Sequence, residues 1–151
     1  GGVFTNAIKF PDSTIQQTAG LTRATTVLGA DTNVPQTEIA TGGGSVLLST
    51  PITLPSTRVI MACTSFRWFA VNNATTTGDR VAFIRVNGVD VGSLMVTDSK
   101  ENDLWQFSNG ACYTTSLSGG SHTIAVHFGG CCGIYGNNFW VGADSRLDVV
   151  W

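Results

Sequence analysis

TRVIMACTSFRWFAV, residues 57–71, is the stretch that decides the fold. Side chains alternate between the two faces of an extended strand, and here both faces are apolar. One face carries Ile60, Ala62, Phe66, Trp68 and Ala70, and the other carries Val59, Met61, Cys63, Phe69 and Val71. A sheet with one face in water shows a single apolar set, so this strand predicts a second covering layer. Neighbouring subunits could supply that layer, or long loops of the same chain could.

The rest of the chain also consists of short strand patterns, without helical periodicity. We expect strands at residues 45–54, 57–71, 79–86, 89–96, 104–107, 111–117, 122–128, 139–141 and 146–151. Asn87-Gly88 lies between two Val-rich runs and predicts a tight hairpin turn, because both of its positions need a positive φ. Pro51 and Pro55 cannot donate ladder hydrogen bonds, which favours an edge strand or a bent one. The predicted fold class is all-β, an antiparallel β-sandwich of the jelly-roll type.

Two regions of the sequence differ in composition. Residues 1–40 are polar and Thr-rich, and they cannot enclose a core of their own. Residues 41–151 follow a Gly-rich turn and contain the strand patterns. We therefore expect an extended N-terminal segment, residues 1–40, followed by a sandwich domain, residues 41–151.

The composition indicates partner chains rather than a nucleic-acid or membrane partner. Only 12% of the 151 residues are charged, against roughly 25% in a typical domain, so part of the surface is expected to be covered by other chains. The net charge is -2 and there is no run of Lys and Arg, which argues against a nucleic-acid partner. No stretch approaches the roughly 20 apolar residues of a membrane span, so we expect no membrane insertion.

The four cysteines do not predict a disulfide framework. Cys131 and Cys132 are adjacent in the sequence, too close for an ordinary bridge, and we expect free thiols there. Cys63 and Cys112 are expected to be small core residues rather than a bonded pair. No C-x-x-C pair suggests zinc, and we expect neither a metal nor a cofactor.

Residues 8–19, IKFPDSTIQQTA, resemble a connector segment of bacteriophage tail fibres. The positions that match are Phe10, Asp12, Thr14, Gln16, Thr18 and Ala19. Ser13 replaces the usual Gly of that pattern, and Gln17 stands where Thr is common. Three copies around a threefold axis could cover one another's Ile8, Phe10 and Ile15, which a single copy leaves exposed. Trimerisation is the expected result, with Trp68 and Phe83 in the interface between sandwich domains.

The resemblance implies a place in a virion. Such connectors precede compact C-terminal β domains, and residues 119–128 and 146–151 are similar to late strands of jelly-roll tips and of trimeric heads like those of tumour necrosis factor and C1q. The implied function is that of a homotrimeric fibre tip, attached to other virion tail proteins, that binds a bacterial cell-surface glycan or protein during adsorption.

Aromatic and amide side chains near Gly-rich loops suggest the ligand-binding region. Indole and phenol rings stack on the apolar faces of sugars, while amide and carboxylate groups bind sugar hydroxyls. The candidate residues are Trp105, Tyr135, Asn137, Asn138, Trp140 and Asp144. A structural alternative remains open, in which Phe139 and Trp140 fill the sandwich end or a subunit interface.

No catalytic arrangement stands out, and we expect a binding protein rather than an enzyme. His122 and His127 are five positions apart in one predicted strand, so they point to opposite faces and cannot share a metal. The carboxylates that could serve a glycosidase are Glu101, Asp103, Asp144 and Asp148, and sequence does not show whether two of them face one cleft. The alternatives are thus a structural fibre connector without receptor specificity, or a polysaccharide-degrading enzyme.

Overall fold

The computed structural model describes residues 7–9, 15–17, 21–34, 40, 42–70, 79–97, 106–107, 111–131 and 139–151, and these residues form β-strands and turns without an α-helix. The strands are β1 (Ala7–Lys9), β2 (Ile15–Gln17), β3 (Arg23–Val27), β4 (Thr32–Val34), β5 (Ser45–Leu54), β6 (Arg58–Ser65), β7 (Arg67–Ala70), β8 (Asp79–Val86), β9 (Val89–Thr97), β10 (Gln106–Phe107), β11 (Ala111–Leu117), β12 (Gly120–Cys131), β13 (Phe139–Val141) and β14 (Arg146–Val150). The predicted all-β class is confirmed.

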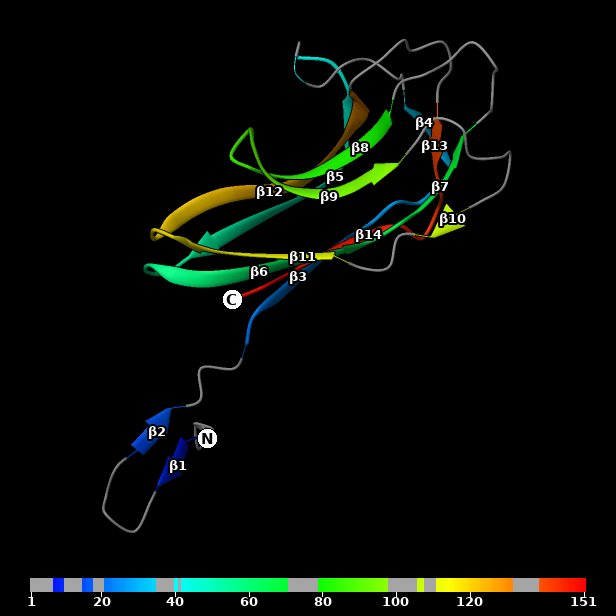
Figure 1. Ribbon diagram of the computed structural model, residues 1–151. Helices are drawn as coiled ribbons and strands as arrows, with labels where there is room; N and C mark the ends of the chain where they lie inside the picture. The colour runs from blue at the N-terminus through cyan, green and yellow to red at the C-terminus, as the bar shows by residue number, and fades with distance from the viewer. Residues whose placement is uncertain are drawn as a thin grey trace.

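Two four-stranded antiparallel sheets face one another as a sandwich (Figure 1). One has the order β11-β6-β14-β3 and the other β5-β12-β8-β9. The chain crosses repeatedly between the two sheets, as in a jelly roll, whereas β8 and β9 are joined by a hairpin within one sheet. A smaller sheet, β10-β7-β13-β4, extends the first one at the end where the 142–145 turn lies. Within the described part of the chain no helix is long and apolar enough to cross a bilayer.

The core lies between the inward faces of the two sheets. From one side it takes Ile60, Ala62, Leu147 and Val149, and from the other Leu48, Ile52, Ile84, Ile124, Val126 and Phe128, all of them buried. The ring of Phe66 meets the ring of Phe128 edge to face, with centroids 5.2 Å apart. Such aromatic pairs add to the free energy of burial, so this contact ties the two sheets together.

The long strand predicted at residues 57–71 is broken in two. Up to Ser65 the chain pairs with β11 and β14, and from Arg67 it pairs with β10 and β13. Phe66, which lies between the two halves, is buried against Phe128. The even-numbered residues stay on the core side through the break. The alternation of side chains along the sequence therefore continues, and it gives no sign that the chain changes sheet.

Several local predictions are confirmed. The predicted ranges 45–54, 79–86, 111–117 and 139–141 match β5, β8, β11 and β13. Asn87 and Gly88 have φ values of 51° and 84° and form the turn between β8 and β9, as a two-residue hairpin of this kind requires. Pro51 lies in β5, an edge strand of its sheet, where a missing donor is tolerated.

Part of the N-terminal segment belongs to the sandwich. β3 pairs with β14, and β4 pairs with β13, so the chain joins the sheets from Arg23 onward. β1 and β2 form a separate hairpin that lies away from the sandwich (Figure 1). The division at residue 40 and the trimerising role of the first residues stay predictions.

Candidate functional site

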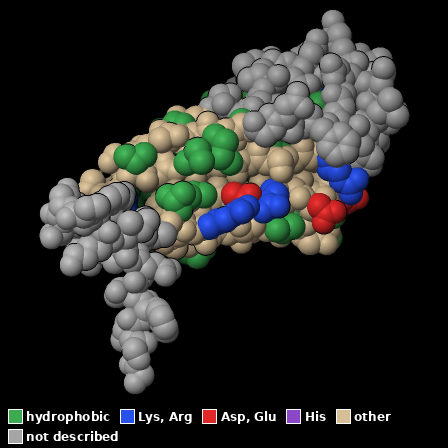
Figure 2. Space-filling model, turned by 90° about the horizontal axis from the view of Figure 1, so that it is seen from below, with side chains coloured by type: hydrophobic (Ala, Val, Ile, Leu, Met, Phe, Trp, Pro, Cys, Tyr) green, Lys and Arg blue, Asp and Glu red, His purple; other side chains and the backbone are tan. Residues whose placement is uncertain are grey.

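The outward side of sheet β11-β6-β14-β3 exposes aliphatic side chains, and we call it the open face. Val59 and Met61 on β6 are 63% and 43% exposed, Val27 on β3 is 52% exposed, and Leu21 continues the same row before β3. β6 is an interior strand of its sheet, so the apolar surface includes the middle of the face and not its rim alone. Figure 2 shows this side, with hydrophobic side chains around a line of charged ones. Val59 and Met61 are neighbours on β6, whereas Val27 lies beside Arg146 further along the sheet. Neighbouring exposed apolar side chains such as Val59 and Met61 mark an interaction site more often than scattered ones do.

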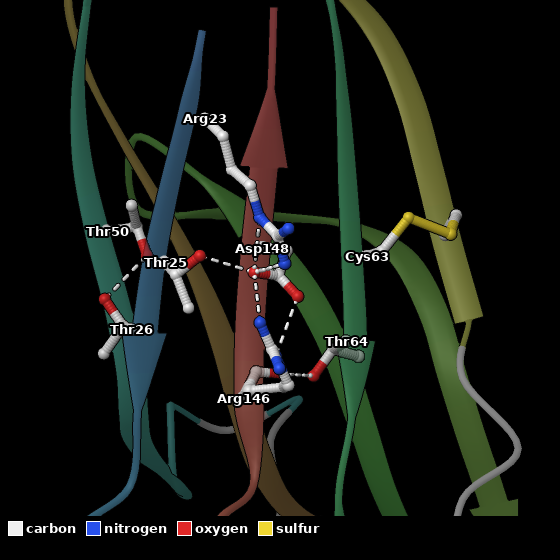
Figure 3. Close-up of polar contacts among 9 residues, drawn as sticks. Arg23, Thr25, Thr26, Thr50, Cys63, Thr64, Arg146 and Asp148 are labelled. Atoms are coloured by element: carbon white, nitrogen blue, oxygen red, sulfur yellow. Dashed lines mark hydrogen bonds and ion pairs between the residues drawn. A yellow bond between two sulfur atoms is a disulfide. The ribbon is translucent and has the colours of Figure 1, made fainter.

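A charged row crosses the open face at β3 and β14. Asp148 accepts hydrogen bonds from Arg23 (2.7 Å), Arg146 (3.0 Å) and the Thr25 hydroxyl (2.5 Å), as Figure 3 shows. Burial alone raises the pKa of Asp148, but the hydrogen bonds from Arg146, Thr25 and Arg23 outweigh it and hold that pKa well below its ordinary range. The charges on this part of the face are therefore already paired within one chain.

Cys63 and Cys112 are joined by a disulfide on the open face, which corrects the expectation of two separate core residues. They are direct partners in the register of β6 and β11, while Asp148 is the partner of Cys63 on the other side. Directly opposite residues of an antiparallel pair bring their Cβ atoms within about 5.5 Å, so the pairing of these strands alone brings the two sulfurs together. The side chains of Cys131 and Cys132 lie outside the described residues.

The outward side of β12 and β8, which we call the covered face, is shielded by the chain itself. His127 is 3% exposed, and its Nδ1 lies 2.9 Å from an Asp90 carboxylate oxygen while its Nε2 lies 3.0 Å from the Gly43 carbonyl oxygen, both within hydrogen-bond distance. Asp90 also accepts a bond from Arg85 (2.7 Å). Burial raises the pKa of Asp90, but the hydrogen bonds from Arg85 and His127 outweigh it and hold the pKa below its ordinary range. The turn that contains Gly43 is thus attached to this face.

Two predicted ligand-binding residues lie near one end of the sandwich. Trp140 on β13 is 37% exposed. Asp144 is exposed in the turn between β13 and β14, with a φ of 67° and its backbone N–H donating to the Leu28 carbonyl (2.9 Å). Trp105, Tyr135, Asn137 and Asn138 lie outside the described residues, so whether they join Trp140 stays a prediction.

The predicted interface residues have different positions. Trp68 is 4% exposed and lies in the core of its own chain, so its assignment to an interface between chains is wrong; the even-numbered face of residues 57–71 is the inward one. Phe83 is half-buried on the covered face, opposite His127. Ile8 and Ile15 lie in the separate hairpin, on β1 and β2, and their side chains, like Phe10, are outside the described set.

Among the described residues, no group of three His, Cys, Asp or Glu side chains could hold a metal ion. Of the carboxylates considered for a glycosidase, Asp148 is bound by two arginines, and Glu101 and Asp103 lie outside the described ranges. His122 accepts a bond from Asn87 at Nδ1 (3.0 Å) and donates from Nε2 to the Ser118 carbonyl (2.8 Å). This histidine therefore links Ser118, before β12, to Asn87 in the turn between β8 and β9.

Sequence reasoning missed a second polar arrangement, beside Trp140. Asp31 accepts hydrogen bonds from Arg67 (2.9 Å) and from the Ala143 backbone N–H (2.6 Å). The three residues come from widely separated segments of the chain, and neither residue type nor spacing signals that they meet. Only the strand register brings them together.

No protein-family model matches the sequence, and no curated protein matches it significantly. Solved structures with a similar arrangement of strands include the Gt strain of infectious bursal disease virus (12% identity, TM-score 0.49, 95% of this chain) and the Eiger TNF of S. frugiperda (12%, 0.49, 86% of this chain and 91% of that one). A third is the C-terminal domain of EclA, a sugar-binding protein (12%, 0.41, 95% of this chain and 89% of that one). The chain spans 37% of the length of the bursal disease virus protein. At this identity the likeness concerns the fold alone.

Proposed function

We propose that this chain is the distal domain of a bacteriophage tail fibre, that three copies associate through their open faces, and that the trimer attaches the virion to a glycan or protein on a bacterial surface. The observation that carries the proposal is the open face itself. Val59 and Met61 cover an interior strand with aliphatic surface that the described part of the chain does not shield. The fibre-like segment at residues 8–19 adds independent support.

The chemistry of the open face suits association with further copies. Burying a fully exposed aliphatic side chain contributes about 1.5–3 kcal/mol, and Val59 and Met61, which are 63% and 43% exposed, would each contribute part of that amount. Removing an ionic group from water is costly unless it is paired, and Arg23, Asp148 and Arg146 are already bonded to one another. A second copy can therefore cover this face without stranding a charge.

Three copies also suit attachment to a cell. Weak sites on one rigid assembly gain avidity when they engage together, by a factor on the order of 100 or more. A monomer would then adsorb far more weakly than the assembly, although each single site is unchanged. This consequence makes assembly and adsorption testable in one experiment.

The test compares the wild type with Met61→Lys, each labelled with a fluorophore and incubated with a panel of bacterial strains. We expect the wild type to adsorb to at least one strain as a trimer, and Met61→Lys to be monomeric and to adsorb on the order of 100-fold more weakly. The matched control is Thr53→Lys, because Thr53 is exposed on β5 in the other sheet. It should leave both properties unchanged.

Other outcomes favour the rival functions. A trimer that adsorbs to no strain would point to a structural connector. The release of new reducing ends from host polysaccharide would point to an enzyme. Equal adsorption by a monomeric Met61→Lys variant would remove the reason for proposing a trimer.

A further inference from the structure

An exposed indole lies on the outward side of sheet β10-β7-β13-β4. Trp140 is 37% exposed, whereas Val141, the next residue of β13, is fully buried. Alternation along the strand thus turns Trp140 away from the core. Asn33 of β4 is its direct cross-strand partner, so the amide lies on the same face within about 5.5 Å, Cβ to Cβ.

An ion pair lies across β13 at Gly142, two residues after Trp140 in the chain. Thr32 and Trp68 are both partners of Val141, and this register places Asp31 and Arg67 on either side of Gly142. Arg67 donates to Asp31 over a distance of 2.9 Å. A Cβ at Gly142 would come within 2.2 Å of the Arg67 side chain, so the pair can span the strand only because this residue is glycine.

The backbone fixes the position of this ion pair. Nε of Arg67 donates to the Ala143 carbonyl (3.3 Å), and the Ala143 N–H donates to Oδ1 of Asp31 (2.6 Å). Both hydrogen bonds that Asp31 accepts end on Oδ1. Within the described part of the chain, Oδ2 therefore remains an acceptor on a side chain that is 43% exposed.

The spacing suits one sugar ring. Residues two apart on a strand are separated by about 7 Å, so an acceptor held above Gly142 lies at the edge of a ring stacked on Trp140. Sugar-binding sites combine an aromatic platform with a few fixed polar groups. Oδ1 of Asn33 is buried without a hydrogen-bond partner among the described residues, an unusual state for an acceptor, and a ligand hydroxyl would satisfy it after a small side-chain rotation.

We propose that this surface is a subsite for a neutral sugar residue of a bacterial surface polysaccharide. The indole of Trp140 stacks on the apolar face of a pyranose ring, and Asp31 and Asn33 accept hydrogen bonds from its hydroxyls. An acidic sugar is disfavoured because its carboxylate would meet that of Asp31. The inference rests on the proposed function only in taking the receptor to be a glycan.

The test measures binding of the purified protein to an array of bacterial lipopolysaccharides and capsular polysaccharides. We expect the wild type to bind at least one neutral polysaccharide and Trp140→Ala to lose roughly tenfold or more in affinity. Trp140→Phe keeps an aromatic face and should lose less. Val89→Ala is the matched control, since Val89 is an exposed apolar residue at a distant turn. Light scattering and thermal unfolding show whether each variant keeps its assembly and its fold.

Each possible result either supports or overturns the proposed subsite. Unchanged binding by a folded Trp140→Ala variant would overturn the subsite, and a change in the mass of its assembly would assign Trp140 to an interface instead. If the wild type binds no polysaccharide, and its adsorption to cells resists periodate but is abolished by proteinase treatment of the cells, the receptor is a protein. The subsite then fails while the proposed function stands. Binding to the array without adsorption to any strain would support the subsite and count against the proposed function.

Discussion

The two outward faces of the sandwich differ in whether the chain covers them. Behind β8 and β12 the chain shields itself, since Val81 and His127 are almost fully buried and the Gly43 turn is bonded to that side. Behind β6 nothing in the described part of the chain covers Val59 and Met61. β6 and β8 both carry apolar residues on two sides, so one sequence pattern corresponds to two structural solutions. The difference indicates which face is left for a partner.

The largest effect on stability is expected from the disulfide of the open face. Replacing Cys63→Ser together with Cys112→Ser removes a crosslink between residues 49 positions apart and should lower the free energy of unfolding by about 2–4 kcal/mol. Urea unfolding measures the loss. Dithiothreitol should destabilise the wild type to a similar degree and leave the double variant unchanged; equal unfolding midpoints for both proteins would show that the bond contributes nothing.

On the covered face, His127→Ala should cost about 2 kcal/mol, because it removes a buried side chain and leaves the partly buried Asp90 carboxylate and Gly43 carbonyl each with one hydrogen bond fewer. Urea unfolding again gives the value. Hydrogen exchange of residues 42–44 should rise at the same time, as the turn loses its attachment. A variant with wild-type stability would mean that the shielding of this face does not depend on His127.

A smaller effect is expected at the charged row of the open face. Asp148→Asn should lower stability by about 1 kcal/mol at neutral pH. Folding lowers the pKa of Asp148, so its contribution is complete above about pH 5 and is lost as the pH falls below about 4, toward the folded-state pKa.

Thermal unfolding between pH 7 and pH 2 checks the sign of this dependence. The wild type should lose more stability than Asp148→Asn over that range. Part of the acid sensitivity should remain in the variant because the pKa of Asp90 is lowered as well. Parallel curves for the two proteins would contradict the role given to the Arg23–Asp148–Arg146 row.

The smallest effect on folding is expected at the open face itself. Val59→Thr should change the stability of the separated chain by no more than about 0.5 kcal/mol, as exposed positions usually do, while it weakens association. Ile60→Thr, one residue away on the core side, should cost several times more. Urea unfolding at protein concentrations below the dissociation constant of the assembly measures the loss of stability in each variant. Equal losses would mean that Val59 is shielded within its own chain.

Local patterns predicted most of the strands, but not the contacts between distant ones. The Asn87-Gly88 turn and the strand at residues 45–54 follow from nearby residues alone. The Cys63–Cys112 bond and the Asp31–Arg67 pair require the register between strands, which no local pattern encodes. β3 and β4 were missed because their Thr-rich sequences carry little apolar signal, and Trp68 was misassigned because alternation does not tell the inward face from the outward one.

The mass of the purified chain in solution tests the central claim most directly. Light scattering coupled to size exclusion, at micromolar concentration, should give three times the 15.9 kDa of one chain. Met61→Lys should give the mass of one chain. A wild type that stays at 15.9 kDa, folded and soluble with Val59 and Met61 in water, would contradict the account.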